Sequence, residues 1–171
     1  DKSAILDNPL VRGDLQLGAI FGSDFWGRPP GEGPGTWRPL VVLTYWLDLN
    51  TQNAPWMLHL NNVASHAIAA LLLALALFRH TRRLELAVLA GALFATLAVN
   101  TEAVAAIVGR ADVMATGFLL LAFWQTPAQD EPRKLWRYAA VFTSMLAALL
   151  CKESALVAPL WLLAAVVLFS A

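Results

Sequence analysis

The sequence has 171 residues, of which 58% are hydrophobic and 14% charged, and its mean hydropathy is +0.59. Soluble domains contain about 25% charged residues, so this composition argues against a water-soluble fold and favours a membrane protein. Twelve basic and twelve acidic residues give a net charge of zero, which leaves no broad basic surface for nucleic acid. We therefore expect no nucleic-acid partner.

The first region, residues 1–56, contains most of the prolines and glycines, and its run at 27–35 is typical of an exposed loop. The segment 38–48 has a helical pattern but is too short to cross a bilayer core about 30 Å thick. Its aromatic residues suit a helix at the membrane interface. The chain opens on polar residues without a cleavable signal, so we expect a fragment whose first region is a large loop.

Long apolar segments follow, and they predict an all-α, polytopic transmembrane helical bundle. Basic residues gather in the short connections near 79–83 and 133–137, which predicts that both connections are cytoplasmic. Because successive spans cross the membrane in alternating directions, the first region, the stretch 100–112 and the turn 151–154 are then expected together on the extracytoplasmic side. The predicted membrane helices are 57–78, 84–100, 103–125, 135–151 and 154–170.

Charged residues remain at or within the extracytoplasmic helix ends, where a charge near mid-membrane costs about 2.5–3.5 kcal/mol. Each has a simple structural explanation. Glu102 could be a first-turn acid beside a cap at Asn100 or Thr101. Arg110 and Asp112 could form a local ion pair that closes a re-entrant turn, and Lys152 and Glu153 could belong to a hydrated turn. Their common position on one side favours a shared functional cavity instead. The residues are Glu102, Arg110, Asp112, Lys152 and Glu153.

His59, Asn62 and His66 have helical spacing and project from nearly one face of the first predicted span. No cysteine pair or carboxylate cluster lies nearby in the sequence to complete a metal site. Hydrogen bonding between helices is therefore the favoured role for these side chains. The sequence shows no glycine-rich phosphate loop, no Ser/His/Asp arrangement and no dinucleotide fingerprint. We expect no cofactor, and a requirement for a divalent metal stays open.

Seven short blocks, in order along almost the whole chain, resemble a known family. Each block is weak alone, but their order makes a specific signal. The family is that of the transmembrane and tetratricopeptide-repeat-containing (TMTC) O-mannosyltransferases. The blocks are Asp1–Pro9, Asp24–Gly27, Arg38–Leu40, the set His59, Asn62 and His66, Thr101–Val104, Gly109–Asp112 and Cys151–Glu153.

The resemblance implies a lipid-donor (GT-C-like) glycosyltransferase that moves mannose, or another hexose, from polyprenyl phosphate to Ser/Thr hydroxyls of acceptor proteins. The resemblance also implies a bacterial inner membrane or endoplasmic reticulum membrane, with the active face extracytoplasmic. Asp1 matches the second member of the family's acidic pair, which implies a general base. Glu102 is expected to help build the acceptor or sugar pocket.

The leaving lipid phosphate calls for cations at membrane depth. Arg110 and Lys152 are the expected phosphate-binding residues, with Arg38 as a third. Asp112 and Glu153 are expected to orient these cations.

The chain departs from the family where a histidine-proline-x-histidine stretch normally precedes Thr101, because residues 97–100 read Leu-Ala-Val-Asn. This change favours a divergent subgroup with a changed acceptor or sugar. Two alternatives stay open. One is a transporter or channel in which Arg110, Asp112 and Lys152 line a path, although the sequence shows no repeat of the kind that transporters contain. The other is a non-catalytic scaffold that keeps the family fold.

Overall fold

The computed structural model describes residues 2–29, 31–33, 35–51, 55–128, 131–132 and 134–160. Every regular element in this part of the chain is helical, and no strand occurs there. The predicted all-α class is therefore confirmed. The helices are α1 Lys2–Ile5, α2 Leu17–Gly22, α3 Pro39–Thr51, α4 Pro55–Thr81, α5 Leu84–Thr96, α6 Thr101–Ala105, α7 Arg110–Gln125 and α8 Leu135–Cys151, with 3-10 turns η1 Ala98–Asn100, η2 Ile107–Gly109 and η3 Glu153–Val157.

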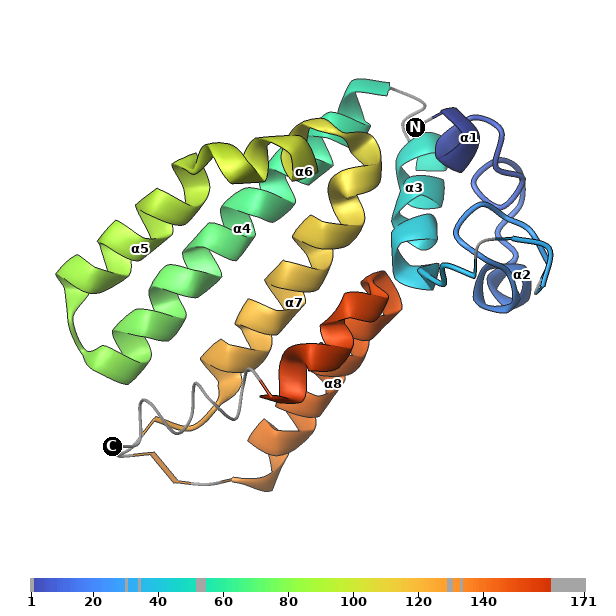
Figure 1. The fold of residues 1–171 in the computed structure, drawn as a ribbon. Coiled ribbons are helices and arrows are strands. Elements are labelled where there is room, and N and C mark those ends of the chain that lie inside the picture. Colours follow the sequence, from blue (N-terminus) through green and yellow to red (C-terminus); the bar gives the residue numbers. More distant parts are fainter. Residues whose placement is uncertain are drawn as a thin grey trace.

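The four long helices α5, α4, α7 and α8 lie side by side in that order (Figure 1). Small residues let them approach closely, as is common for helices packed in membranes. Gly91 of α5 lies so near α4 that a Cβ atom there would be 3.1 Å from the Ala70 carbonyl oxygen. The outer faces stay apolar, with Val88 of α5 58% and Phe142 of α8 69% exposed, which suits contact with lipid tails.

Among the described residues, two helical segments are long and apolar enough to cross a membrane, Trp56–Thr81 and Ile107–Gln125. Leu84–Thr96 and Ala98–Ala105, which are bent by 48° at their junction, add a third crossing in this part of the chain if they act as one span. The helix α8 is shorter. Of the helix expected at 154–170, the described part begins with the turn η3, and residues 161–171 lie outside the described residues.

The structure interrupts the helices predicted at 84–100 and 103–125, because the chain leaves the helical conformation at Leu97 and again at Ala106. Both residues have extended backbone angles, with ψ of 124° and 129°. The side chain of Asn100 donates to the Phe94 carbonyl oxygen at 2.7 Å and so satisfies an acceptor at the end of α5. An asparagine that bonds the backbone in this way competes with the continuing helix.

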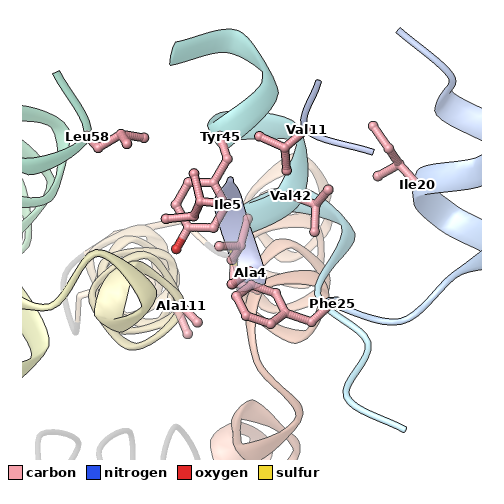
Figure 2. Close-up of a cluster of buried hydrophobic side chains, with 12 residues drawn as sticks. Ala4, Ile5, Val11, Ile20, Phe25, Val42, Tyr45, Leu58 and Ala111 are labelled. Carbon is pink, nitrogen blue, oxygen red and sulfur yellow. The ribbon is translucent and has the colours of Figure 1, made fainter. Parts of the chain in front are cut away.

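The first region folds as a layer against one end of the long helices (Figure 1). Asn8 is fully buried, and its side-chain amide donates to the carbonyl oxygens of Ala4 at 3.1 Å and Phe25 at 3.0 Å. The helix α3 connects this layer to α4, α7 and α8. Figure 2 shows the apolar cluster that joins the two parts, which includes Ala4, Ile5, Val11, Ile20, Phe25, Val42, Tyr45, Leu58 and Ala111.

Candidate functional site

A pocket of about 380 Å³ lies where the first region meets the connection between α6 and α7. It brings together three predicted site residues that are far apart in the sequence: Arg38, Glu102 and Asp112. Apolar and aromatic side chains form the rest of the wall, as in most binding pockets. The complete lining is Phe25, Trp26, Arg38, Val99, Glu102, Ala103, Ala106, Val108, Gly109 and Asp112.

Two local features of the sequence shape this wall. The carboxylate Oδ1 of Asp24 accepts hydrogen bonds from the N–H groups of Trp26 at 2.9 Å and Arg28 at 2.8 Å, which fixes the turn that presents Trp26. At Gly109 a Cβ atom would lie 2.2 Å from the carbonyl oxygen of Ala103. Only glycine therefore lets the turn η2 pack against α6 and bring Glu102 and Asp112 to one pocket.

Two ion pairs stand at this pocket. The Nε atom of Arg38 lies 3.3 Å from Oε2 of Glu153, and the Lys152 ammonium pairs with the Asp112 carboxylate. Lys152 has an extended backbone that ends α8, so the two neighbouring residues 152 and 153 reach different partners. The side chains of Glu153 and Asp112 are 43% and 49% exposed. Such partly exposed pairs are weak, on the order of 1 kcal/mol or less, and a phosphate group can compete for their cations.

Glu102 belongs to the first turn of α6 and is exposed at the pocket. Among the described residues it takes part in none of the ion pairs. Asn100 occupies the N-cap position of α6 but makes no side-chain cap hydrogen bond, so the expected cap at Asn100 is not formed. Glu102 is thus a carboxylate available for a hydrogen bond or a proton from a bound molecule.

Arg110 does not lie at the pocket surface, contrary to its expected role as a phosphate ligand. Its side chain is 2% exposed, and its N–H groups donate to buried neighbours. The physical reason is that an aspartate on α3 provides a closer counter-charge. The hydrogen bonds run from Nε to Asn62 Oδ1 at 2.9 Å, from Nη1 to Thr44 Oγ1 at 3.2 Å and to Asp48 Oδ2 at 2.5 Å, and from Nη2 to the Leu58 carbonyl oxygen at 2.7 Å.

The Arg110 cluster, which consists of Arg110, Thr44, Asp48, Leu58 and Asn62, joins α3, α4 and α7. Its main acid, Asp48, is 8% exposed and also accepts a hydrogen bond from Asn61 at 2.6 Å. The ring of Tyr45 lies 4.6 Å from the guanidinium carbon, and its hydroxyl donates to the Ile107 carbonyl oxygen at 2.7 Å. Burial raises the pKa of the Tyr45 hydroxyl, which therefore stays protonated and keeps donating.

Sequence reasoning missed Asp48, although one signal was present. Asp48 is an acid at the end of the otherwise apolar stretch Leu40–Leu47, and the structure places it on the buried side of α3. The local ion pair considered for Arg110 and Asp112 does not form, because Asp112 pairs with Lys152. The charged residues 110 and 112 therefore serve different networks.

The predicted hydrogen bonding between helices is confirmed for Asn62 and His66. The Asn62 amide donates to the Ala106 carbonyl oxygen at 3.0 Å, and His66 Nε2 lies 3.3 Å from the Ala95 carbonyl oxygen. His59 and His66 also line a second cavity, of about 310 Å³, beside α5 and α6. In the described part of the chain, no group of three or more His, Cys, Asp or Glu side chains is placed to hold a metal ion.

Asp1, the expected general base, lies outside the described residues, so its place relative to the pocket stays a prediction. The helix α1 begins at Lys2, and its Ala4 packs in the same cluster as Phe25, which lines the pocket.

Fold and site together describe a helical membrane protein with a charged pocket at one end of its long helices. Comparison with known proteins identifies the family. The chain is 36% identical to the protein O-mannosyl-transferase Tmtc2 of Drosophila melanogaster over 170 residues, 92% of the chain. It is 40% identical to Tmtc1 of the same organism over 92% of the chain, and 36% identical to human TMTC3 over 90%. Over about 90% of its length the chain matches part of proteins of the TMTC family, which confirms the resemblance.

The chain spans only about a fifth of these relatives, 18%, 19% and 17% of their lengths. No family model matches the sequence, and no solved structure matches it.

Proposed function

We propose that this chain is part of a membrane glycosyltransferase that moves mannose from a polyprenyl-phosphate carrier to Ser/Thr hydroxyls of proteins. The observation that carries the proposal is the pocket that gathers Arg38, Glu102 and Asp112, with Lys152 and Glu153 paired to its charged residues. The family name of the relatives supports mannose as the sugar and a protein as the acceptor.

The reaction forms a bond between the acceptor oxygen and the anomeric carbon of mannose, and it breaks the bond between that carbon and the phosphate oxygen. Negative charge develops on the leaving polyprenyl phosphate, where fixed cations stabilise it most effectively. Arg38 offers a planar fork for two phosphate oxygens and Lys152 a compact charge. Glu153 and Asp112 hold these cations in place before the donor binds.

The acceptor hydroxyl must lose its proton as it attacks, and a carboxylate beside the attacking oxygen serves as the base. We assign this step to Asp1, and to Glu102 the binding of the acceptor or sugar hydroxyls in the pocket. Glu102 suits this role because it is exposed at the pocket and has no ion-pair partner among the described residues.

The sidedness of the pocket follows from charge. The opposite end of the helices is basic. It contains Arg79 in the last turn of α4, Arg82 and Arg83 just after α4, and Lys134 and Arg137 around the start of α8. Basic connections favour the cytoplasmic side, so we place the pocket on the extracytoplasmic side of a bacterial inner membrane or of the endoplasmic reticulum. Membrane lipid, the polyprenyl-phosphate sugar and an acceptor protein segment are the expected partners.

The structure weakens the transporter alternative, which required Arg110 to line a path. Arg110 is instead enclosed by α3, α4 and α7. A scaffold without activity remains the competing outcome of the experiment, because residues 97–100 lack the family's histidines.

The test uses the parent protein in lipid vesicles, with radiolabelled polyprenyl-phosphate mannose and a threonine-containing peptide. We expect transfer by the wild type and a reduction of roughly 10²-fold or more in Glu102→Gln, because a neutral amide accepts a weaker hydrogen bond from a hydroxyl than a carboxylate does. Glu85→Gln is the matched control, since Glu85 is an exposed first-turn acid at the other end of the bundle. Absence of transfer by a folded wild type would favour the scaffold.

A further inference from the structure

At the end of the helices opposite the pocket, two arginines share one carboxylate oxygen. Arg79, in the last turn of α4, and Arg137, in the first turns of α8, both donate to Oε2 of Glu131. The same oxygen lies 3.4 Å from the N–H of Ala128. The side chains of Arg79 and Arg137 are 17% and 16% exposed. This Arg79–Glu131–Arg137 cluster thus holds two positive charges against one negative charge in a largely buried place.

The cluster also contains unused hydrogen-bond donors. Among the described residues, the buried Nε atoms of Arg79 and Arg137 have no hydrogen-bond partner, because each arginine donates to Glu131 through an Nη atom. Buried charged donors are normally paired. A guanidinium group that uses Nε together with an Nη atom presents the two-pronged edge that matches a phosphate or a carboxylate. Both arginines therefore keep an edge suited to a second anion.

Tryptophan rings cover the faces of both guanidinium groups and leave their edges for hydrogen bonding. The guanidinium carbon of Arg79 lies 5.6 Å from the Trp124 ring centroid, and that of Arg137 lies 5.4 Å from the Trp136 centroid. Trp136 is 61% exposed and the neighbouring Leu135 is 84% exposed. An exposed tryptophan beside an apolar residue at a helix end is typical of the membrane interface.

The surroundings of the cluster are basic. Segments 79–85 and 130–137 together contain six basic and three acidic residues, a net charge of +3. The side chains of Arg82, Arg83 and Lys134 are exposed there. Basic groups between membrane helices near the cytoplasmic membrane surface attract anionic lipid headgroups, which are present there at high local concentration.

We propose that the Arg79–Glu131–Arg137 cluster binds the phosphate of an anionic phospholipid headgroup. The phosphate oxygens bind the Nε edges of the two arginines after side-chain rotation. Their negative charge balances the second arginine, whose positive charge Glu131 alone does not neutralise. The acyl chains then lie along the exposed apolar surface of α8, beside Trp136. The site is separate from the pocket at the other end and does not depend on the proposed transferase activity.

The experiment measures lipid retained by the purified parent protein after exchange into phosphatidylcholine discs containing phosphatidylglycerol, together with the melting temperature. We expect selective retention of phosphatidylglycerol and a higher melting temperature with it. Arg79→Gln and Arg137→Gln are expected to lower retention about tenfold or more. The matched control is Arg83→Gln, an exposed cation of the same connection, which is expected to retain the lipid.

Glu131→Gln keeps the test decisive if the arginine variants fold poorly. It removes the competing anion and leaves both arginines, so we expect tighter phosphatidylglycerol retention. Equal loss in Arg83→Gln, or unchanged retention in the arginine variants and Glu131→Gln alike, would overturn the proposal in favour of diffuse surface charge. In a third measurement, the melting temperature of the protein is determined with inorganic phosphate in place of phosphatidylglycerol. Equal stabilisation by phosphate alone would overturn the assignment to a lipid.

Discussion

Arg110→Met is expected to destabilise the folded protein by about 3–5 kcal/mol, the usual cost of removing one partner of a buried ion pair. The variant leaves the Asp48 carboxylate, 8% exposed, without its cation. It also removes the donors that bind Asn62 and the Leu58 carbonyl oxygen, and so loosens the contact between α3, α4 and α7. The measurement is the thermal unfolding of the purified parent protein in detergent.

The double variant Arg110→Met/Asp48→Leu separates charge from packing. Because apolar side chains often replace a buried ion pair at little cost, we expect it to regain most of the lost stability. Arg12→Met serves as the surface control, since Arg12 is exposed in the first region. An unfolding temperature of Arg110→Met equal to that of the control would show that the cluster does not connect α3 to the membrane helices.

Arg38→Ala and Lys152→Ala are each expected to lower the rate of mannosyl transfer by roughly 10²–10³-fold, the usual effect of removing one group that stabilises transition-state charge. Both cations belong to partly exposed pairs, so their loss should cost about 1 kcal/mol of stability or less. The measurement is the transfer rate in lipid vesicles, compared with the unfolding temperature of each variant.

The conservative variant Lys152→Arg is expected to keep part of the activity, because it preserves the charge but changes the shape of the donor group. Arg12→Ala is the control for a change in net charge. Wild-type rates in both Arg38→Ala and Lys152→Ala would remove the two cations from the mechanism and leave the pocket without a phosphate ligand of its own.

The sequence predicts the membrane character and the helical class well, because both follow from composition and from long apolar segments. It also predicts that Arg38, Glu102 and Asp112 lie near one another, since alternation of the spans places their segments on the same side. The structure adds the pairs of these residues with Lys152 and Glu153. The pairing partners follow from three-dimensional packing, which spacing along one helix does not reveal.

The role of Arg110 shows this limit. In the sequence it resembles Lys152, a cation at a helix end, and both were expected to face a lipid phosphate. The difference arises from Asp48, 62 residues away, which meets Arg110 only when α3 packs against α4 and α7. The end of α5 at Thr96, before the predicted end at residue 100, was missed for a similar reason. Leu97 and Val99 fit an apolar helix, and the side-chain bond of Asn100 to Phe94 appears only in the structure.

The central claim, that the pocket lined by Arg38, Glu102 and Asp112 receives the lipid-linked sugar, is tested most directly by photocrosslinking. A polyprenyl-phosphate mannose analogue with a photoreactive group on the sugar is bound to the parent protein, irradiated, and located by peptide mapping. We expect labels within residues 24–38 and 99–112, competed by unlabelled donor and weakened in Arg38→Ala. Labelling centred on the cavity at His59 and His66, unchanged in Arg38→Ala, would contradict the assignment.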